Sequence, residues 1–142
     1  MLSKAEAEKE KVRAIIEKHI GAMHPVTRRR KSWLKSGDGK LSVFMTFSRY
    51  YTSAQPWWYD IDPNDIKQWL CYEKAFIVFV MEEHTRVLII PAKVIQKLVN
   101  GLEPKGYGEY KLHVIEEAGE YKFCEMPDSM TEFYNSYLLL TD

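Results

Sequence analysis

Residues 75–81 read Ala-Phe-Ile-Val-Phe-Val-Met, and residues 87–90 read Val-Leu-Ile-Ile. Neither run carries a charge, and both are rich in β-branched and aromatic side chains, which favours strands that are covered on both faces. Residues 82–85, Glu-Glu-His-Thr, form the short polar link between the two runs. These runs are therefore predicted to form the centre of a β-sheet.

Sequence signals for the start of a helix occur on both sides of these two strands along the chain. Ser3 and Glu6 have the spacing of a capping box, and apolar residues at helical spacing follow them. Asp62 is an acidic N-cap, and Pro63 suits the first position of a helix. Helices are predicted at 4–20, 63–72, from Pro91 to about Gly101, and at 130–139.

The remaining segments divide into strands and loops. A strand is predicted at 41–48 and a hairpin at 110–115 and 121–124, whereas residues 24–36 show neither period and are predicted to be a loop. The expected order is α-β-α-ββ-α-ββ-α, which is an α+β fold with a five-stranded mixed or antiparallel sheet flanked by helices. A single domain is expected over 1–142, with a helix and a basic loop in 1–40 and the sheet and its packing helices in 41–142.

Composition sets limits on the class of protein. The chain has 142 residues, of which 46% are hydrophobic and 28% charged, as in one ordinary globular domain and unlike a disordered chain or a rod. The longest uncharged apolar run is too short to cross a bilayer, so a cytoplasmic protein without membrane contact is expected. Cys71 and Cys124 match no metal spacing and are expected to be buried free thiols. No metal site and no cofactor are predicted.

The net charge of zero conceals an asymmetry. Residues 1–40 hold eleven basic and five acidic residues, and the remainder holds nine and fifteen, so the formal charges are +6 and −6. The basic residues cluster in the predicted loop as Arg28-Arg29-Arg30-Lys31, with Trp33 and Lys35 following. Such a cluster can neutralise phosphates and release counterions, which gives salt-sensitive affinity for a polyanion.

A second feature is the segment between the strand at 41–48 and the helix at 63–72. Residues 48–60 contain five of the chain's 19 aromatic residues. Loops normally lie at the surface, where large rings must be covered or used. Rings beside Arg49 suit a flat ligand such as a nucleobase, although the same rings could instead fold over one end of the sheet as a small core.

Two other functions remain open from the residues alone. Glu109-Tyr110-Lys111 and Glu120-Tyr121-Lys122 have the E-x-K spacing of Mg²⁺-dependent PD-(D/E)xK nucleases, and Asp60 or Asp62 could supply a further carboxylate. The aromatic segment could also receive a peptide in a protein-interaction domain.

The chain resembles small domains attached to restriction-modification proteins. The resemblance covers about 41–116 and consists of Trp57-Trp58-Tyr59-Asp60-Ile61 before a helix, two buried strands, an Ile90-Pro91 helix start, and Leu112-His113-Val114-Ile115. It implies a DNA-recognition module, sometimes for modified DNA, that works beside a nuclease or AAA+ subunit. This chain has Tyr59-Asp60 where that pattern often has an aromatic residue and glycine.

The leading hypothesis is a non-catalytic DNA-recognition module of a restriction or other host-defence system. Its cations are predicted to hold phosphates, and its rings to stack on an extruded or modified base. Tyr51, Gln55 and Asp60 are candidates for reading the base edge. The predicted binding residues are Arg28, Arg29, Arg30, Lys31, Trp33, Lys35, Arg49, Tyr50, Tyr51, Gln55, Trp57, Trp58, Tyr59 and Asp60.

Overall fold

The structure is a computed structural model that describes residues 2–54, 56–104, 106 and 108–141. Its α-helices are α1 (Lys4–Ile20), α2 (Pro63–Trp69) and α3 (Ala92–Asn100), and two short 3-10 helices follow, η1 (Thr131–Phe133) and η2 (Tyr137–Thr141). Its strands are β1 (Met23–Thr27), β2 (Arg30–Ser36), β3 (Leu41–Ser48), β4 (Trp57–Ile61), β5 (Lys74–Met81), β6 (Val87–Pro91), β7 (Tyr110–Glu117) and β8 (Glu120–Phe123).

Two sheets organise these strands. The larger sheet has five strands in the order β1-β2-β3-β5-β6, and the smaller has three in the order β4-β7-β8. In the larger sheet β3 and β5 are parallel, from Leu41 opposite Lys74 to Ser48 opposite Met81, and the other neighbours are antiparallel. The predicted class, helices with a five-stranded mixed sheet, is confirmed.

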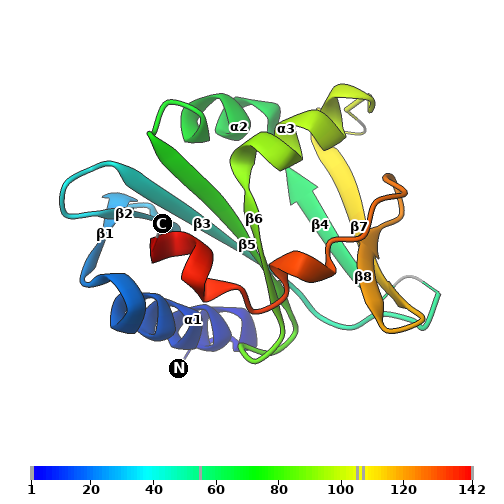
Figure 1. The fold of residues 1–142 in the computed structure, drawn as a ribbon, viewed down its shortest axis with the longest axis horizontal. Helices are drawn as coiled ribbons and strands as arrows, with labels where there is room; N and C mark the ends of the chain where they lie inside the picture. The colour runs from blue at the N-terminus through cyan, green and yellow to red at the C-terminus, as the bar shows by residue number, and fades with distance from the viewer. Residues whose placement is uncertain (1, 55, 105, 107, 142) are drawn as a thin grey trace.

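The five-stranded sheet is covered on both faces (Figure 1). Helix α1 packs on one face, where Val12 and Ile16 meet the side chains of Val43 and Val78 in one hydrophobic cluster. Helices α2 and α3 and the three-stranded sheet cover the other face. Because β5 and β6 are buried on both sides, nearly every residue of each strand is apolar.

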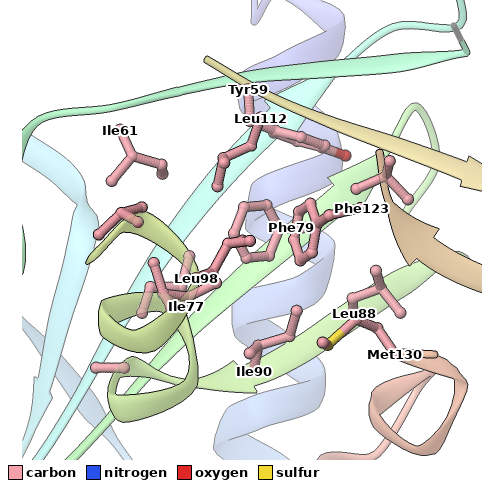
Figure 2. Close-up of a cluster of buried hydrophobic side chains, with 14 of the residues drawn as sticks. Tyr59, Ile61, Ile77, Phe79, Leu88, Ile90, Leu98, Leu112, Phe123 and Met130 are labelled. Atoms are coloured by element: carbon pink, nitrogen blue, oxygen red, sulfur yellow. The ribbon is translucent and has the colours of Figure 1, made fainter. Parts of the chain in front are cut away.

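The second face holds the larger core. Figure 2 shows side chains from β4, β7 and β8 pointing toward Phe79 of β5. The Phe79 ring lies 4.9 Å from the Tyr59 ring and 5.4 Å from the Phe123 ring, centroid to centroid, both edge to face. Aromatic pairs favour this geometry. The contacts fix the small sheet on the large one, with its other face turned outward.

The predicted helix starts are confirmed. Ser3 and Glu6 form a capping box at the start of α1, and the backbone N–H of Gly21 closes its end at a φ of 93°. The Asp62 side chain accepts from the Asn64 N–H and caps α2, with Pro63 at its first turn.

Several predicted elements are wrong. Residues 24–36 form most of the β1–β2 hairpin instead of a loop, and residues 57–61 form β4. The predicted helix at 130–139 is absent among the described residues of that segment, which form two 3-10 turns separated by Asn135 at a φ of 50°. Cys71 and Cys124 are free, as expected, but both are exposed.

The sheet order also differs from the expectation. Strand β5 lies inside the large sheet, but β6 is at its edge instead of its centre. The C-terminal segment runs along this edge, where the Asn135 N–H donates to the Val87 carbonyl at 2.8 Å and the Val87 N–H donates to the Asn135 side chain at 3.1 Å. These bonds occupy edge groups that would otherwise be open to another strand. Among the described residues, the helices are all too short or too polar to span a membrane.

Candidate functional site

The outer face of the three-stranded sheet carries exposed aromatic and charged groups side by side. Along β4 the side chains alternate, so that Trp57, Tyr59 and Ile61 are buried while Trp58 and Asp60 are exposed. Trp58 lies opposite His113 of β7, and Asp60 lies opposite Lys111. Two cross-strand pairs therefore sit side by side on the outward face.

Trp58 is the centre of an exposed aromatic group. Its indole is 45% exposed, and the 46% exposed ring of Tyr51 lies 5.6 Å away, centroid to centroid. The Arg49 guanidinium carbon lies 4.4 Å from the centroid of the Tyr51 ring, a cation–π contact. We call Arg49, Tyr51, Trp58 and His113 the aromatic ladder. The ladder presents flat rings and a cation to solvent.

His113 supports Trp58 from the neighbouring strand. The two rings meet edge to face, with centroids 4.7 Å apart. Glu125 fixes His113 at two points, accepting from its backbone N–H at 2.9 Å and lying 2.8 Å from its Nδ1. A ring held at both backbone and side chain keeps its orientation, so Trp58 rests against a fixed surface.

Asp60 and Lys111 form an ion pair beside the ladder. The Lys111 Nζ lies 2.7 Å from Asp60 Oδ1, and the side chains are 42% and 53% exposed. The hydrogen bond to Asp60 raises the pKa of Lys111 above its ordinary value, so the ammonium stays charged. The pair offers a carboxylate acceptor and an ammonium donor next to Trp58.

Three predicted stacking rings are buried instead of exposed. Trp57 and Tyr59 are each 3% exposed and Trp33 is 4% exposed, because all three belong to the core between the two sheets. The Tyr59 hydroxyl donates to the Val80 carbonyl at 2.8 Å, and the Trp33 indole N–H donates to Ser42 at 2.7 Å. The prediction that these rings stack on a base is therefore wrong, and they build the scaffold under the site. Tyr50 is exposed, with its ring edge to face on Trp57.

The residues of the basic cluster lie in different surroundings and do not form one surface group. Arg30 is held by Asp65 of α2, and Lys31 lines a cavity beside α1 of about 130 Å³. Lys35 lies half-buried within β2, opposite Ser42. Nη1 and Nη2 of Arg30 each donate a hydrogen bond to Asp65, so this guanidinium has a partner within the fold, and its phosphate role stays a prediction. Arg28 and Arg29 are exposed at the β1–β2 turn, and Gln55 lies outside the described residues.

Sequence reasoning missed His113 and Glu125 as members of the site. Trp58 and His113 lie far apart along the chain and become neighbours only because β4 pairs with β7. The sequence therefore points to His113 only after residues 57–61 are recognised as a strand that pairs with residues 110–114. The predicted hairpin at 110–115 placed His113 on a half-exposed strand, but without β4 it had no neighbour.

The residues of the nuclease alternative are only partly brought together. Asp60 and Lys111 meet, and the charge of Glu109 contributes to the raised pKa of Lys111. Asp62 caps α2, and Lys122 pairs with Glu117 at 3.3 Å. Within the described part of the chain, no group of three or more His, Cys, Asp or Glu side chains is arranged to hold a metal ion.

Comparison of the chain with protein-family models, with curated proteins and with solved structures found no match.

Proposed function

We propose that this chain is a DNA-recognition module that stacks an unpaired or extruded base on the aromatic ladder. The observation that carries the proposal is Trp58, which is 45% exposed on the open face of a sheet and is backed by His113 and flanked by Tyr51. Exposed aromatic surface that is rimmed by polar side chains is typical of a binding site.

The chemistry of the ladder suits a base better than an aliphatic ligand. A nucleobase has a π-face of the same kind as indole, and stacking on an aromatic side chain stabilises binding by about 1–3 kcal/mol per base. The Arg49 guanidinium carbon lies 4.4 Å from the centroid of the Tyr51 ring, and a guanidinium carries five N–H donors in a fork that matches the geometry of a phosphate. Arg28 and Arg29 are exposed and remain candidates for further phosphate contacts.

The resemblance to restriction-modification domains supports DNA as the polymer. Extruding a base from a duplex costs a few kcal/mol, which stacking and hydrogen bonds in a receiving site can offset. The same proposal includes three further points. The partner is a nuclease or AAA+ subunit, the ligand can be a modified base, and the protein is cytoplasmic.

A binding assay tests the proposal. We expect fluorescence anisotropy to detect a labelled single-stranded decamer bound by the protein, and Trp58→Ala to weaken this binding at least about fivefold. Leu138→Ala is the matched control, because Leu138 is also a large exposed apolar residue, at 71%, but lies in η2. Equal affinity of Trp58→Ala and Leu138→Ala would overturn the proposal.

Two further outcomes separate the alternatives. A nuclease using Asp60 and Lys111 would cut the decamer when Mg²⁺ is added, whereas a recognition module leaves it intact. A peptide-binding domain would associate with a protein partner in a salt-insensitive manner and would ignore the decamer.

A further inference from the structure

We infer that the Asp60–Lys111 pair reads the base stacked on Trp58 and selects guanine. This inference rests on the proposed function and assigns the ligand class of the same site. Three observations support the inference: the position of the Asp60–Lys111 pair, the hydrogen-bond donors and acceptors that the pair offers, and the different donors and acceptors on the edges of the four bases.

The pair is placed where the edge of a stacked base would lie. Asp60 follows Trp58 by two residues on the same face of β4, which corresponds to a separation of about 7 Å along the strand. Lys111 has the same relation to His113 on β7. A ring stacked on the indole and extending along the strands therefore brings its hydrogen-bonding edge to Asp60 and Lys111.

The exposure of the pair leaves its hydrogen-bonding capacity open to a ligand. Lys111 contacts Oδ1 of Asp60 at 2.7 Å, and an ammonium has three donors while a carboxylate has about four acceptor sites. The side chains are 42% and 53% exposed, so a base reaches them without moving the core.

Guanine is the base whose Watson–Crick edge matches this pair most completely. Its N1–H and N2 amino group are two adjacent donors, which the two carboxylate oxygens of Asp60 can accept together. Its O6 is the next group along the edge and accepts from Lys111. Bidentate contacts of this kind between a charged side chain and a base discriminate by about 1–3 kcal/mol.

The other bases match less well. Adenine and cytosine each offer one amino group with ring or carbonyl acceptors beside it, and thymine offers one N–H between two carbonyls. In each case one carboxylate oxygen faces no donor or faces another acceptor, which is unfavourable. Since the Watson–Crick edge is occupied in a duplex, the inference concerns an unpaired or extruded guanine.

The test uses the whole protein and four labelled thymidine decamers with dG, inosine, dA or dC at one central position. Inosine lacks only the N2 amino group. We expect the dG decamer to bind about tenfold more tightly than the dA and dC decamers, with inosine between them. Asp60→Asn should remove this preference, because the amide replaces one acceptor with a donor, while binding of the plain thymidine decamer persists through Trp58.

Glu117→Gln is the matched control. Glu117 lies further along β7, is 63% exposed and is paired with Lys122. It should retain the guanine preference. Equal binding of the four decamers by the unaltered protein, or a guanine preference that survives in Asp60→Asn, would overturn the inference and leave the proposed function standing. Unchanged binding in Trp58→Ala would overturn both.

Discussion

Arg30 binds Asp65 through two hydrogen bonds, from Nη1 to Oδ1 at 2.6 Å and from Nη2 to Oδ2 at 2.8 Å. The guanidinium carbon also lies 5.1 Å from the centroid of the Phe44 ring. The bonds join β2 to the first turn of α2 over the edge of the core. A cation that stands within a run of basic residues thus stabilises the fold.

Loss of this pair should lower stability. Asp65→Ala leaves the Arg30 guanidinium without its partner beside an apolar surface, and we expect the free energy of unfolding in urea at pH 7 to fall by about 2 kcal/mol. Asp60→Ala should lower it clearly less, because the Asp60–Lys111 pair is exposed. Equal losses in the two variants would contradict a structural role for Arg30.

A second prediction concerns acid stability. Glu8 of α1 is buried, and its Oε1 accepts from the His84 N–H at 2.7 Å and lies 2.9 Å from the His84 Nδ1. The bonds to His84 lower the pKa of Glu8 from 4.5 to about 2. Because the folded-state pKa is the lower one, this contribution to stability is complete above about pH 4.5 and is lost as the pH falls toward about 2.

Urea midpoints measured between pH 7 and pH 2.5 check this expectation. The Glu8→Gln variant should be less stable at pH 7 and should lose less stability on acidification than the unaltered protein. Glu10→Gln, at an exposed position of the same helix, is the control and should follow the unaltered protein. A Glu8→Gln variant with unchanged acid sensitivity would disprove the role of Glu8.

The buried rings under the site should affect stability and not binding. Tyr59→Phe removes the hydroxyl that donates to the Val80 carbonyl, and we expect a loss of about 1 kcal/mol in the free energy of unfolding. Because Tyr59 faces the core, the affinity for the decamer should stay the same in an anisotropy titration. A loss of affinity without a loss of stability would mean that Tyr59 contacts the ligand.

Arg49 should contribute an electrostatic part of the affinity. If its guanidinium contacts one phosphate, Arg49→Ala should reduce the slope of log affinity against log salt by about 0.7 for single-stranded DNA. Titrations at four salt concentrations measure this slope, and Lys18→Ala on the exposed side of α1 serves as a charge-matched control. An unchanged slope for Arg49→Ala would exclude the phosphate contact.

Local signals were sufficient for the parts of the fold that depend on local chemistry. The capping box at Ser3 and the Asp62-Pro63 pair predicted α1 and α2, since a cap acts within one helical turn. The β1–β2 hairpin escaped prediction because Trp33 and Leu34 are adjacent and both buried, on opposite faces of β2. With only these two apolar residues among polar ones, β2 shows neither the alternation of a half-buried strand nor the long apolar run that predicted β5 and β6.

The site was only half predictable for a related reason. Trp57 and Trp58 are chemically identical neighbours, and only the phase of β4 decides that one is 3% exposed and the other 45%. That phase depends on which side of β4 meets Phe79, a contact between segments distant in sequence. Composition identified the aromatic segment, but tertiary packing selected the ring that faces solvent.

Tryptophan fluorescence tests the central claim most directly. Of the four tryptophans, Trp33, Trp57 and Trp69 are buried, so added quencher reaches chiefly Trp58. We predict that a saturating decamer lowers the fluorescence by stacking on Trp58 and protects the remaining emission from iodide, and that Trp58→Phe abolishes both changes. Binding detected by anisotropy with unchanged fluorescence and unchanged access of iodide would contradict the account.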